Sequence, residues 1–434
     1  MRAVPGFFEV DALPALRSTI RHLYADVFWF GVLAGSLMAF LSIYASRIGA
    51  SGFQIGLLSA GPGMINLLIS MPAGRWLEGR PLVRMTYRSS VLHRLLYLAM
   101  IPLPWLANES WQVWGIILIS LIMAVPGTLL AIAFNAMFAE VIPAEKRAEV
   151  VGRRNALVAI SMTATTLLCG LILDRLVFPW SYQIVFAIGA AGALLSSYHL
   201  GQLQPLPKDK VRRVNRLLND FARPGLMRFA DAFRRPVGLR YLALSGNKSL
   251  LRLELLRSSF GPYLGAMLFF YTVQYVPIPL FPLFFVRNLN LSDGFISWGS
   301  ALFHLMMLLA SMYLVRLSAR FSHRQLMVSG AFLYCLYPLL MGQAHDARLF
   351  LVASVLGGGV WALTNGGLVN RLMERVPEAD RPGHMALHNI ALNLGILAGS
   401  LIGPLLADWF GLREAILLGS GLRFLGGLLL LVWG

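Results

Sequence analysis

Residues 140–147 read Glu140-Val-Ile-Pro-Ala-Glu-Lys-Arg147, and residues 374–381 read Glu374-Arg-Val-Pro-Glu-Ala-Asp-Arg381. The Glu, Pro and Arg of the two stretches are separated by 234 positions, and the same spacing relates Asn155 to Asn389 and Asp174 to Asp408. A second register, offset by 241 positions, pairs four residues of 55–75 with identical residues of 296–316. The chain therefore contains two copies of one unit in the same order.

The composition around these repeats is that of a membrane protein. Of the 434 residues, 57% are hydrophobic and 13% are charged, whereas a soluble domain carries about 25% charged residues. The apolar residues lie in runs of roughly twenty, the length that crosses ~30 Å of hydrocarbon as a helix. Hydrocarbon offers no water to backbone polar groups, so each run must be a helix. Twelve spans are predicted, at 27–46, 53–73, 90–106, 111–138, 156–173, 178–200, 262–286, 295–317, 325–343, 349–371, 385–407 and 415–433.

The basic residues indicate which side each loop faces. If the N-terminus is cytoplasmic, 31 of the 37 Lys and Arg residues fall in inner segments, counted with the inner ends of the spans, five fall in outer loops, and Arg423 lies within the last span. This is the positive-inside pattern, and it predicts that both termini are cytoplasmic in a cell inner or plasma membrane. The net charge of +17 is spread over many loops, so it does not suggest nucleic-acid binding, which needs a basic face on a soluble module.

The expected organisation is all-α, with two parallel six-helix repeats at 26–200 and 262–434. A cytoplasmic segment at 1–25 precedes them, and a basic cytoplasmic loop at 201–261 joins them. Two stretches of that loop, 210–221 and 226–233, interleave basic and apolar residues, which suits either the anionic inner leaflet or a solvated linker.

Motifs for chemistry are missing from the sequence. Cys169 and Cys335 both fall inside apolar runs, so neither a disulfide nor a thiolate metal site is expected. We find no phosphate-binding loop and no zinc-hydrolase motif. The chain is therefore not expected to be an enzyme or to need a cofactor or metal.

Six plus six helices, a long central loop and a short loop after the second helix resemble the major facilitator superfamily. The family's loop signature is roughly G-x-x-x-D-R-x-G-R, and the matching stretch here is Gly74-Arg-Trp-Leu-Glu78-Gly-Arg80-Pro-Leu-Val-Arg84, with Glu for Asp and a displaced glycine. The drug/proton antiporter signature of the fourth helix is absent at 124–128, and a glycine run like that of the fifth helix appears instead at 395–404. The resemblance implies a secondary transporter whose halves rock about a cavity between them, and we expect a monomer.

Polar side chains inside the spans indicate where that cavity lies. A charged side chain at the centre of a membrane helix costs about 2.5–3.5 kcal/mol of insertion free energy, so polar and charged groups there usually face a cavity. The predicted cavity residues are Asp26, Trp29, Tyr44, Asn66, Asn135, Tyr271, Gln274, His304, Trp361, Asn365, Asn389 and Asn393. The alternative for any single Asn is a hydrogen bond between helices, and for an aromatic residue packing.

Three ionisable side chains in or near the spans leave two interpretations each. His304 could bind substrate or carry a coupling proton, or it could be a packed, hydrogen-bonded histidine. Asp26 could accept a proton, or it could be the N-cap of the first helix. Arg423 could snorkel to the interface or pair with a partner inside the bundle.

Charged residues at the inner helix ends recur in both repeats, and by the resemblance they would latch the outward-open state. These predicted gate residues are Arg75, Glu78, Arg80, Glu140, Arg147, Arg316, Glu374 and Arg381. The alternative is a solvated charged face. Helix bends are expected at Pro277, Pro279 and Pro282, where proline removes backbone hydrogen bonds.

The resulting expectation is alternating-access transport of a small organic solute within the bilayer, with protons as the coupling ion to be tested. Efflux of an amphipathic compound is favoured over uptake of a sugar or anion, because aromatic side chains line the helices and no pair of cavity Arg or Lys residues is found. The alternatives are a lipid or lysolipid flippase on the same fold, and a non-transporting membrane scaffold or receptor that works through its central loop.

Overall fold

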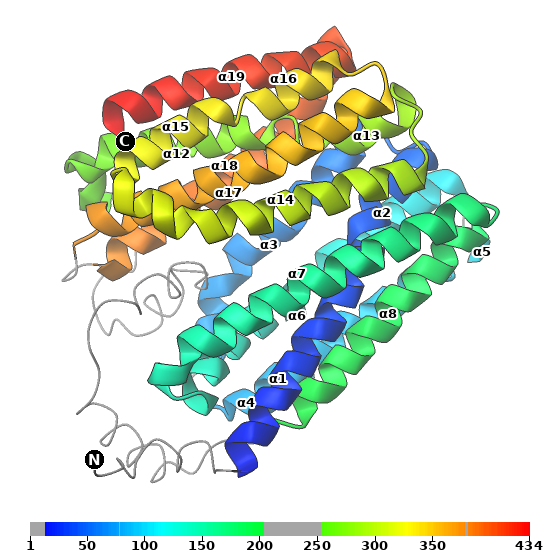
Figure 1. Ribbon diagram of the computed structural model, residues 1–434. Coiled ribbons are helices and arrows are strands. Elements are labelled where there is room, and N and C mark those ends of the chain that lie inside the picture. The colour runs from blue at the N-terminus through cyan, green and yellow to red at the C-terminus, as the bar shows by residue number, and fades with distance from the viewer. Residues whose placement is uncertain (1–13, 78, 107, 204–252, 378–380) are drawn as a thin grey trace, which may run out of the picture.

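A computed structural model describes residues 14–77, 79–106, 108–203, 253–377 and 381–434. All elements in these ranges are helical, and they form two bundles that we call the N-terminal half (14–203) and the C-terminal half (253–434). Figure 1 shows the two bundles side by side. The predicted all-α fold with two six-helix repeats is confirmed. The amphipathic stretches predicted at 210–221 and 226–233 lie outside the described residues.

The N-terminal half is built from six spans, of which the first and third are broken. The elements are α1 (Pro14–Leu33), the π-helical turn η1 (Ala34–Met38), α2 (Ala39–Arg47), α3 (Gly52–Leu77), α4 (Leu82–Leu95), η2 (Leu96–Met100), α5 (Leu103–Leu106), α6 (Glu109–Val141), α7 (Ala144–Arg175) and α8 (Trp180–Gly201).

The C-terminal half repeats this arrangement after a short turn, and its first and third spans are again broken. The elements are η3 (Leu253–Arg257), α12 (Phe260–Tyr275), α13 (Leu280–Arg287), α14 (Asp293–Arg320), α15 (His323–Leu333), α16 (Leu336–Gln343), α17 (Ala347–Arg375), α18 (Arg381–Phe410) and α19 (Leu412–Trp433).

The twelve predicted spans correspond to these helices, although most helices are longer than the apolar runs. In the described part of the chain, 11 spans are long and apolar enough to cross a membrane, and the remaining one is the broken α4–η2–α5 segment. One prediction needs correction. Helix α1 begins at Pro14, so Asp26 lies well inside the helix and its interpretation as a helix N-cap is wrong. The cytoplasmic segment at 1–25 stays a prediction.

Local sequence explains where several helices begin and break. The side chains of Asn108, Ser292 and Asp346 accept hydrogen bonds from the first turns of α6, α14 and α17, which satisfies backbone N–H groups that have no partner within the helix. Helix α12 ends just before Pro277 and α13 begins just after Pro279. The predicted break at Pro277 and Pro279 therefore lies between the two segments of the seventh span, whereas Pro282 lies in the first turn of α13.

The hydrophobic core differs between the two ends of the molecule. We call the end where α1 begins and α19 ends the terminal end, and the end where α2 meets α13 the distal end (Figure 1). At the distal end, one buried cluster joins residues of both halves, among them Phe40, Tyr182 and Phe284. Toward the terminal end, the described buried apolar residues form clusters that each stay within one half, two in the N-terminal half and one in the C-terminal half. The halves thus share a core at one end only.

Candidate functional site

The halves are joined at the distal end by an ion pair. Arg47, the last residue of α2, donates from Nε and Nη2 to Oδ1 of Asp293, the first residue of α14, at 2.9 and 2.8 Å. Nη2 also donates to the carbonyl oxygen of Leu291 at 2.8 Å. The Asp293 side chain is 9% exposed and that of Arg47 is 26% exposed, so the pair is partly shielded from water.

A second carboxylate crosses between the halves beside this pair. Asp174, near the end of α7, accepts from the backbone N–H of Gly294 at 2.9 Å and from the Ser292 hydroxyl at 3.1 Å. It thereby places a negative charge on the N-terminus of α14, where the helix dipole favours one. Gly294 leaves room for this contact, because a Cβ there would lie 2.0 Å from Asp174 Oδ2. On the C-terminal side, Arg287 donates to the Ala50 carbonyl at 2.6 Å.

The predicted gate residues lie at the terminal end, and their described contacts stay within one half. Arg147 donates to the carbonyl oxygens of Ile142 and Ala139 at the end of α6. Glu374 pairs with Arg371 at 3.0 Å.

The other gate residues whose side chains are described also show no polar contact with the opposite half. Arg80 stacks on Trp76, Arg316 lies near the ring of Tyr313, and Glu140 is exposed. The side chains of Arg75, Glu78 and Arg381 lie outside the described ones. A latch between the halves at this end stays a prediction. It applies to the other conformation of the transporter, in which the terminal end is closed.

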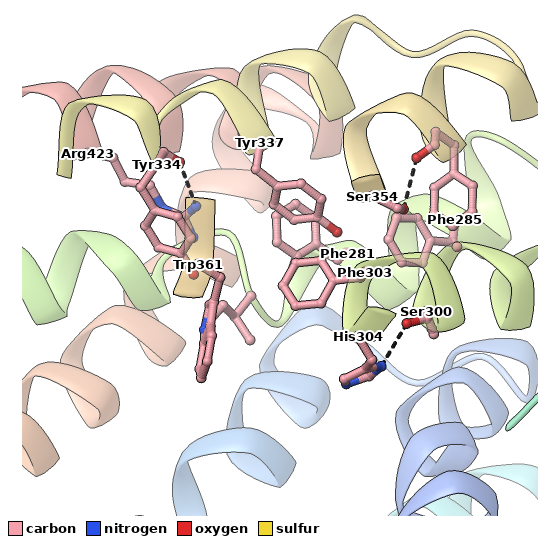
Figure 2. A pocket seen from close by; sticks show the side chains of 13 residues that line it. Phe281, Phe285, Ser300, Phe303, His304, Tyr334, Tyr337, Ser354, Trp361 and Arg423 are labelled. Atoms are coloured by element: carbon pink, nitrogen blue, oxygen red, sulfur yellow. Dashed lines mark hydrogen bonds between the residues drawn. The ribbon is translucent and has the colours of Figure 1, made fainter. Parts of the chain in front are cut away.

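A cavity of about 270 Å³ lies inside the C-terminal half (Figure 2). It is lined from five spans, and seven of its thirteen lining residues are Phe, Tyr or Trp. The rings pack edge to face, Phe281 on Tyr337 with centroids 5.0 Å apart and Phe285 on Phe350 at 4.9 Å. Ser300 and Ser354 are among its polar lining residues. We call this cavity the aromatic pocket.

Arg423 lines the aromatic pocket from the middle of α19 and is completely buried, with 0% exposure. Its guanidinium donates to the carbonyl oxygens of Gln274 at 2.6 Å and Tyr334 at 3.3 Å, and lies 4.3 Å from the Tyr334 ring centroid. Figure 2 shows it beside that ring at one end of the pocket. The snorkelling interpretation of Arg423 is wrong, because the side chain faces the bundle interior.

Two predicted cavity residues, His304 and Trp361, also line the aromatic pocket, and both are partly exposed. His304 Nδ1 lies 2.7 Å from the Ser300 carbonyl oxygen. A carbonyl only accepts hydrogen bonds, so Nδ1 carries the proton in this contact. Figure 2 shows both side chains pointing away from Tyr337 and toward the N-terminal half, whose ribbon is blue. They form the mouth of the pocket, and Arg423 lies at its buried end.

Asp26 belongs to a separate polar cluster in the N-terminal half. Its carboxylate, 3% exposed, lies 3.1 Å from Arg154 Nη2 and 3.7 Å from Arg94 Nη2, and it accepts from the Ser196 hydroxyl at 2.5 Å. These partners come from α7, α4 and α8, so the cluster ties four spans together. Asp26 does not line the aromatic pocket.

The remaining predicted cavity residues are distributed over both halves. Most of them hydrogen-bond within their own half: Tyr44 to Gln112, Tyr271 to His388, Asn66 to Thr128, and Asn135, Asn365 and Asn393 to carbonyl oxygens one turn away. Asn389 supplies the carbonyl for Asn393, the Gln274 side chain is buried, and Trp29 is partly exposed. Their role in a cavity stays a prediction.

The sequence interpretation missed the charged residues that hold the structure together. Arg47 and Arg94 were counted as loop charges, as was Arg154, and Asp293 was not singled out. A signal was available for Arg94, because it falls inside the predicted span 90–106. Arg154 lies just before the predicted span 156–173 and gave no such signal. For Arg47 and Asp293 no such signal exists, since only the folded chain brings them together.

Comparison with known families settles the broader identity. The sequence model of the Major Facilitator Superfamily matches residues 27–261 and 263–434. The chain belongs to this superfamily. It is therefore a membrane-embedded secondary transporter and not an enzyme.

Relatives within the superfamily are distant. The multi-drug resistance efflux pump PmrA homolog of Lactococcus lactis subsp. lactis is 23% identical over 90% of this chain and 88% of that protein. Among solved structures, the nucleoside transporter NupG superposes with a TM-score of 0.68 at 12% identity, covering 96% of this chain and 98% of that one. A D-xylose-proton symporter also gives a TM-score of 0.68, at 14% identity, with coverages of 96% and 97%. These structures share the superfamily fold.

Proposed function

We propose that this transporter exports a small amphipathic solute with an aromatic body, and that the aromatic pocket is part of its binding site. The pocket is the observation that carries the proposal. Its lining is mostly rings, with a few polar groups at defined places, which is the usual composition of a small-molecule site. Offset or edge-to-face contacts add about 0.5–1.5 kcal/mol per ring pair beyond the area buried.

Alternating access follows from how the halves meet. They share contacts at the distal end and have separate cores at the terminal end. With the termini cytoplasmic, as the positive-inside pattern predicts, this conformation faces the cytoplasm. The solute would then reach the pocket from inside the cell, pass the mouth formed by His304 and Trp361, and leave after the distal contacts open.

Export is supported by the chemistry of the pocket and by one relative. A site lined with rings suits hydrophobic compounds that accumulate in cells, and the Lactococcus lactis relative is named a multi-drug resistance efflux pump. The solute and the direction of transport in this chain are our inference from these two observations.

We further propose that His304 couples transport to protons. It is partly exposed, lies at the pocket mouth, and is a side chain whose charge can change near neutral pH. Asp26, the other candidate, is enclosed by two arginines and a serine away from the pocket. Protonation of His304 would change the charge next to a bound solute. A proton gradient could then drive release of the solute.

A binding screen followed by flux tests this function. Purified protein would be screened for thermal stabilisation by aromatic drugs and metabolites, and the best ligand would be followed in proteoliposomes with and without a pH gradient. We expect the gradient to accelerate flux and His304→Gln to abolish that acceleration while ligand stabilisation is retained. His345→Gln, at an exposed histidine outside the aromatic pocket, is the matched control and should keep the acceleration.

Two outcomes would contradict the proposal. If flux ignores the gradient and survives His304→Gln, proton coupling through this residue is wrong. If deletion of residues 208–235 abolishes function in cells while purified protein shows no flux of any ligand, a scaffold that works through the central loop is the better account.

A further inference from the structure

We propose that the aromatic pocket selects a small organic anion, a flat one- or two-ring body that bears a carboxylate or similar group, and that Arg423 binds the anionic group. This deepens the proposed function and rests on the pocket being the solute site. The sequence alone favoured other solutes, because it offered no pair of basic residues in the cavity. One buried arginine at the end of an aromatic pocket changes that expectation.

The hydrogen bonding of Arg423 leaves capacity for a ligand. A guanidinium has five N–H donors in a fixed fork. Two are used by the carbonyl oxygens of Gln274 and Tyr334, and Nε is buried with no hydrogen-bond partner. Buried donors without partners are unfavourable. An acceptor in the pocket would relieve this.

Among the described residues, no carboxylate forms an ion pair with Arg423. Its guanidinium contacts the carbonyl oxygens of Gln274 and Tyr334 and the ring of Tyr334, all of them uncharged. An isolated buried cation is costly unless it is paired. A carboxylate matches the guanidinium fork with two parallel hydrogen bonds, so an anion is the ligand that this end of the pocket favours.

The rest of the pocket defines the body of the anion. Rings of Phe281, Phe303 and Tyr337 form its walls, and Trp361 lies at the mouth. The volume of about 270 Å³ is slightly below the ~300–1,000 Å³ that is usual for small-molecule sites. A flat body of one or two rings fits these walls, with its anionic group toward Arg423.

A purely structural role for Arg423 makes a different prediction. Gln274 lies at the end of α12 and Tyr334 just after α15, where helix breaks leave carbonyl oxygens without partners. Arg423 satisfies both. If that were its whole role, substitution would lower stability but would not change which ligand charge the protein prefers.

Binding of three probes with the same ring system separates these roles. The probes are 2-naphthoate, 2-naphthalenemethanol and 2-naphthylmethylammonium, measured by titration calorimetry on the full-length protein in detergent. For the unaltered protein we expect 2-naphthoate to bind roughly tenfold or more tightly than the alcohol, and the ammonium most weakly, because charge-assisted hydrogen bonds favour the carboxylate. In Arg423→Gln the naphthoate-to-alcohol ratio is expected to fall to about one, with the affinity for the alcohol retained. The control Arg413→Gln, in the same half but outside the pocket, keeps the ratio.

A second pair of variants keeps the test decisive if Arg423→Gln does not fold. Trp361→Glu introduces a carboxylate into the pocket, and Trp361→Gln is the neutral match of the same size. We expect naphthoate to bind at least about tenfold more weakly to the Glu variant than to the Gln variant. Equal binding to the two, or a preference of the unaltered protein for the alcohol or the ammonium, overturns the proposal. Binding is measured independently of flux. If the protein selects the anion but transports nothing, the transport proposal is refuted and the anion-binding proposal stands.

Discussion

Removal of the Arg47–Asp293 pair is expected to shift the balance between the two conformations of the transporter. In Arg47→Ala, three hydrogen bonds from one guanidinium to the C-terminal half are lost. A hydrogen bond to a charged group contributes about 1.5–3 kcal/mol, and an exposed pair only ~0.2–1 kcal/mol. With Arg47 26% exposed, we take an intermediate value of about 1–2 kcal/mol, which changes an equilibrium by a factor of about 5–30.

Distances across the distal end measure this shift directly. Spin labels at Val177 and Asn288, which are exposed in the two halves at this end, would report the populations by electron–electron double resonance after Cys169 and Cys335 are replaced by serine. We expect the longer distance to gain population in Arg47→Ala and the charge swap Arg47→Asp/Asp293→Arg to restore part of the short one.

The matched control is Arg413→Ala, which removes an arginine at the same end whose hydrogen bond among the described residues stays within its own half, to the Gly342 carbonyl. It should leave the distribution unchanged. If Arg47→Ala has no effect on the distances, or if the control has an equal one, the distal pair does not hold the halves together and this reasoning is refuted.

Three further predictions follow from particular contacts. Gly170→Ala would place a Cβ 1.9 Å from the Ser297 hydroxyl across the halves, so the same spin labels should show opening, whereas Gly265→Ala, with nothing within 4 Å, should not. Asp26→Asn leaves two buried arginines without their carboxylate and should lower stability by roughly 3–5 kcal/mol, seen as a lower melting temperature in detergent; an unchanged melting temperature would argue against the cluster. Tyr44→Phe removes one buried hydrogen bond and should cost about 1 kcal/mol in the same assay.

The two-half fold was predictable because its signals are local or repeated. Spans are set by hydropathy over about twenty residues, and the 234-position spacing related one half to the other. The break between α12 and α13 was also predictable, because Pro277 and Pro279 act through their own backbone.

Only part of the site was predictable, because its residues are brought together by helix rotation and tilt. His304 and Trp361 were found as polar or aromatic side chains in spans, yet nothing in the sequence placed them at one pocket. For Arg423 both snorkelling and a partner inside the bundle stayed open, since a lone arginine in an apolar run gives no indication of which way it faces. The start of α1 was missed because its first turns carry charged residues, and these lower the apolar signal without preventing a helix.

Locking the distal end tests the central claim, that the solute crosses between two halves that must separate there. Gly52 and Pro404 face each other across the halves, with 3.2 Å between a Cβ at Gly52 and that of Pro404, close to the ~3.5–4.5 Å that a disulfide spans. Gly52→Cys/Pro404→Cys would be oxidised in proteoliposomes after Cys169 and Cys335 are replaced, and flux of the best aromatic ligand would be measured. We predict that flux stops on oxidation and returns on reduction. Undiminished flux through the cross-linked protein would contradict alternating access between these halves.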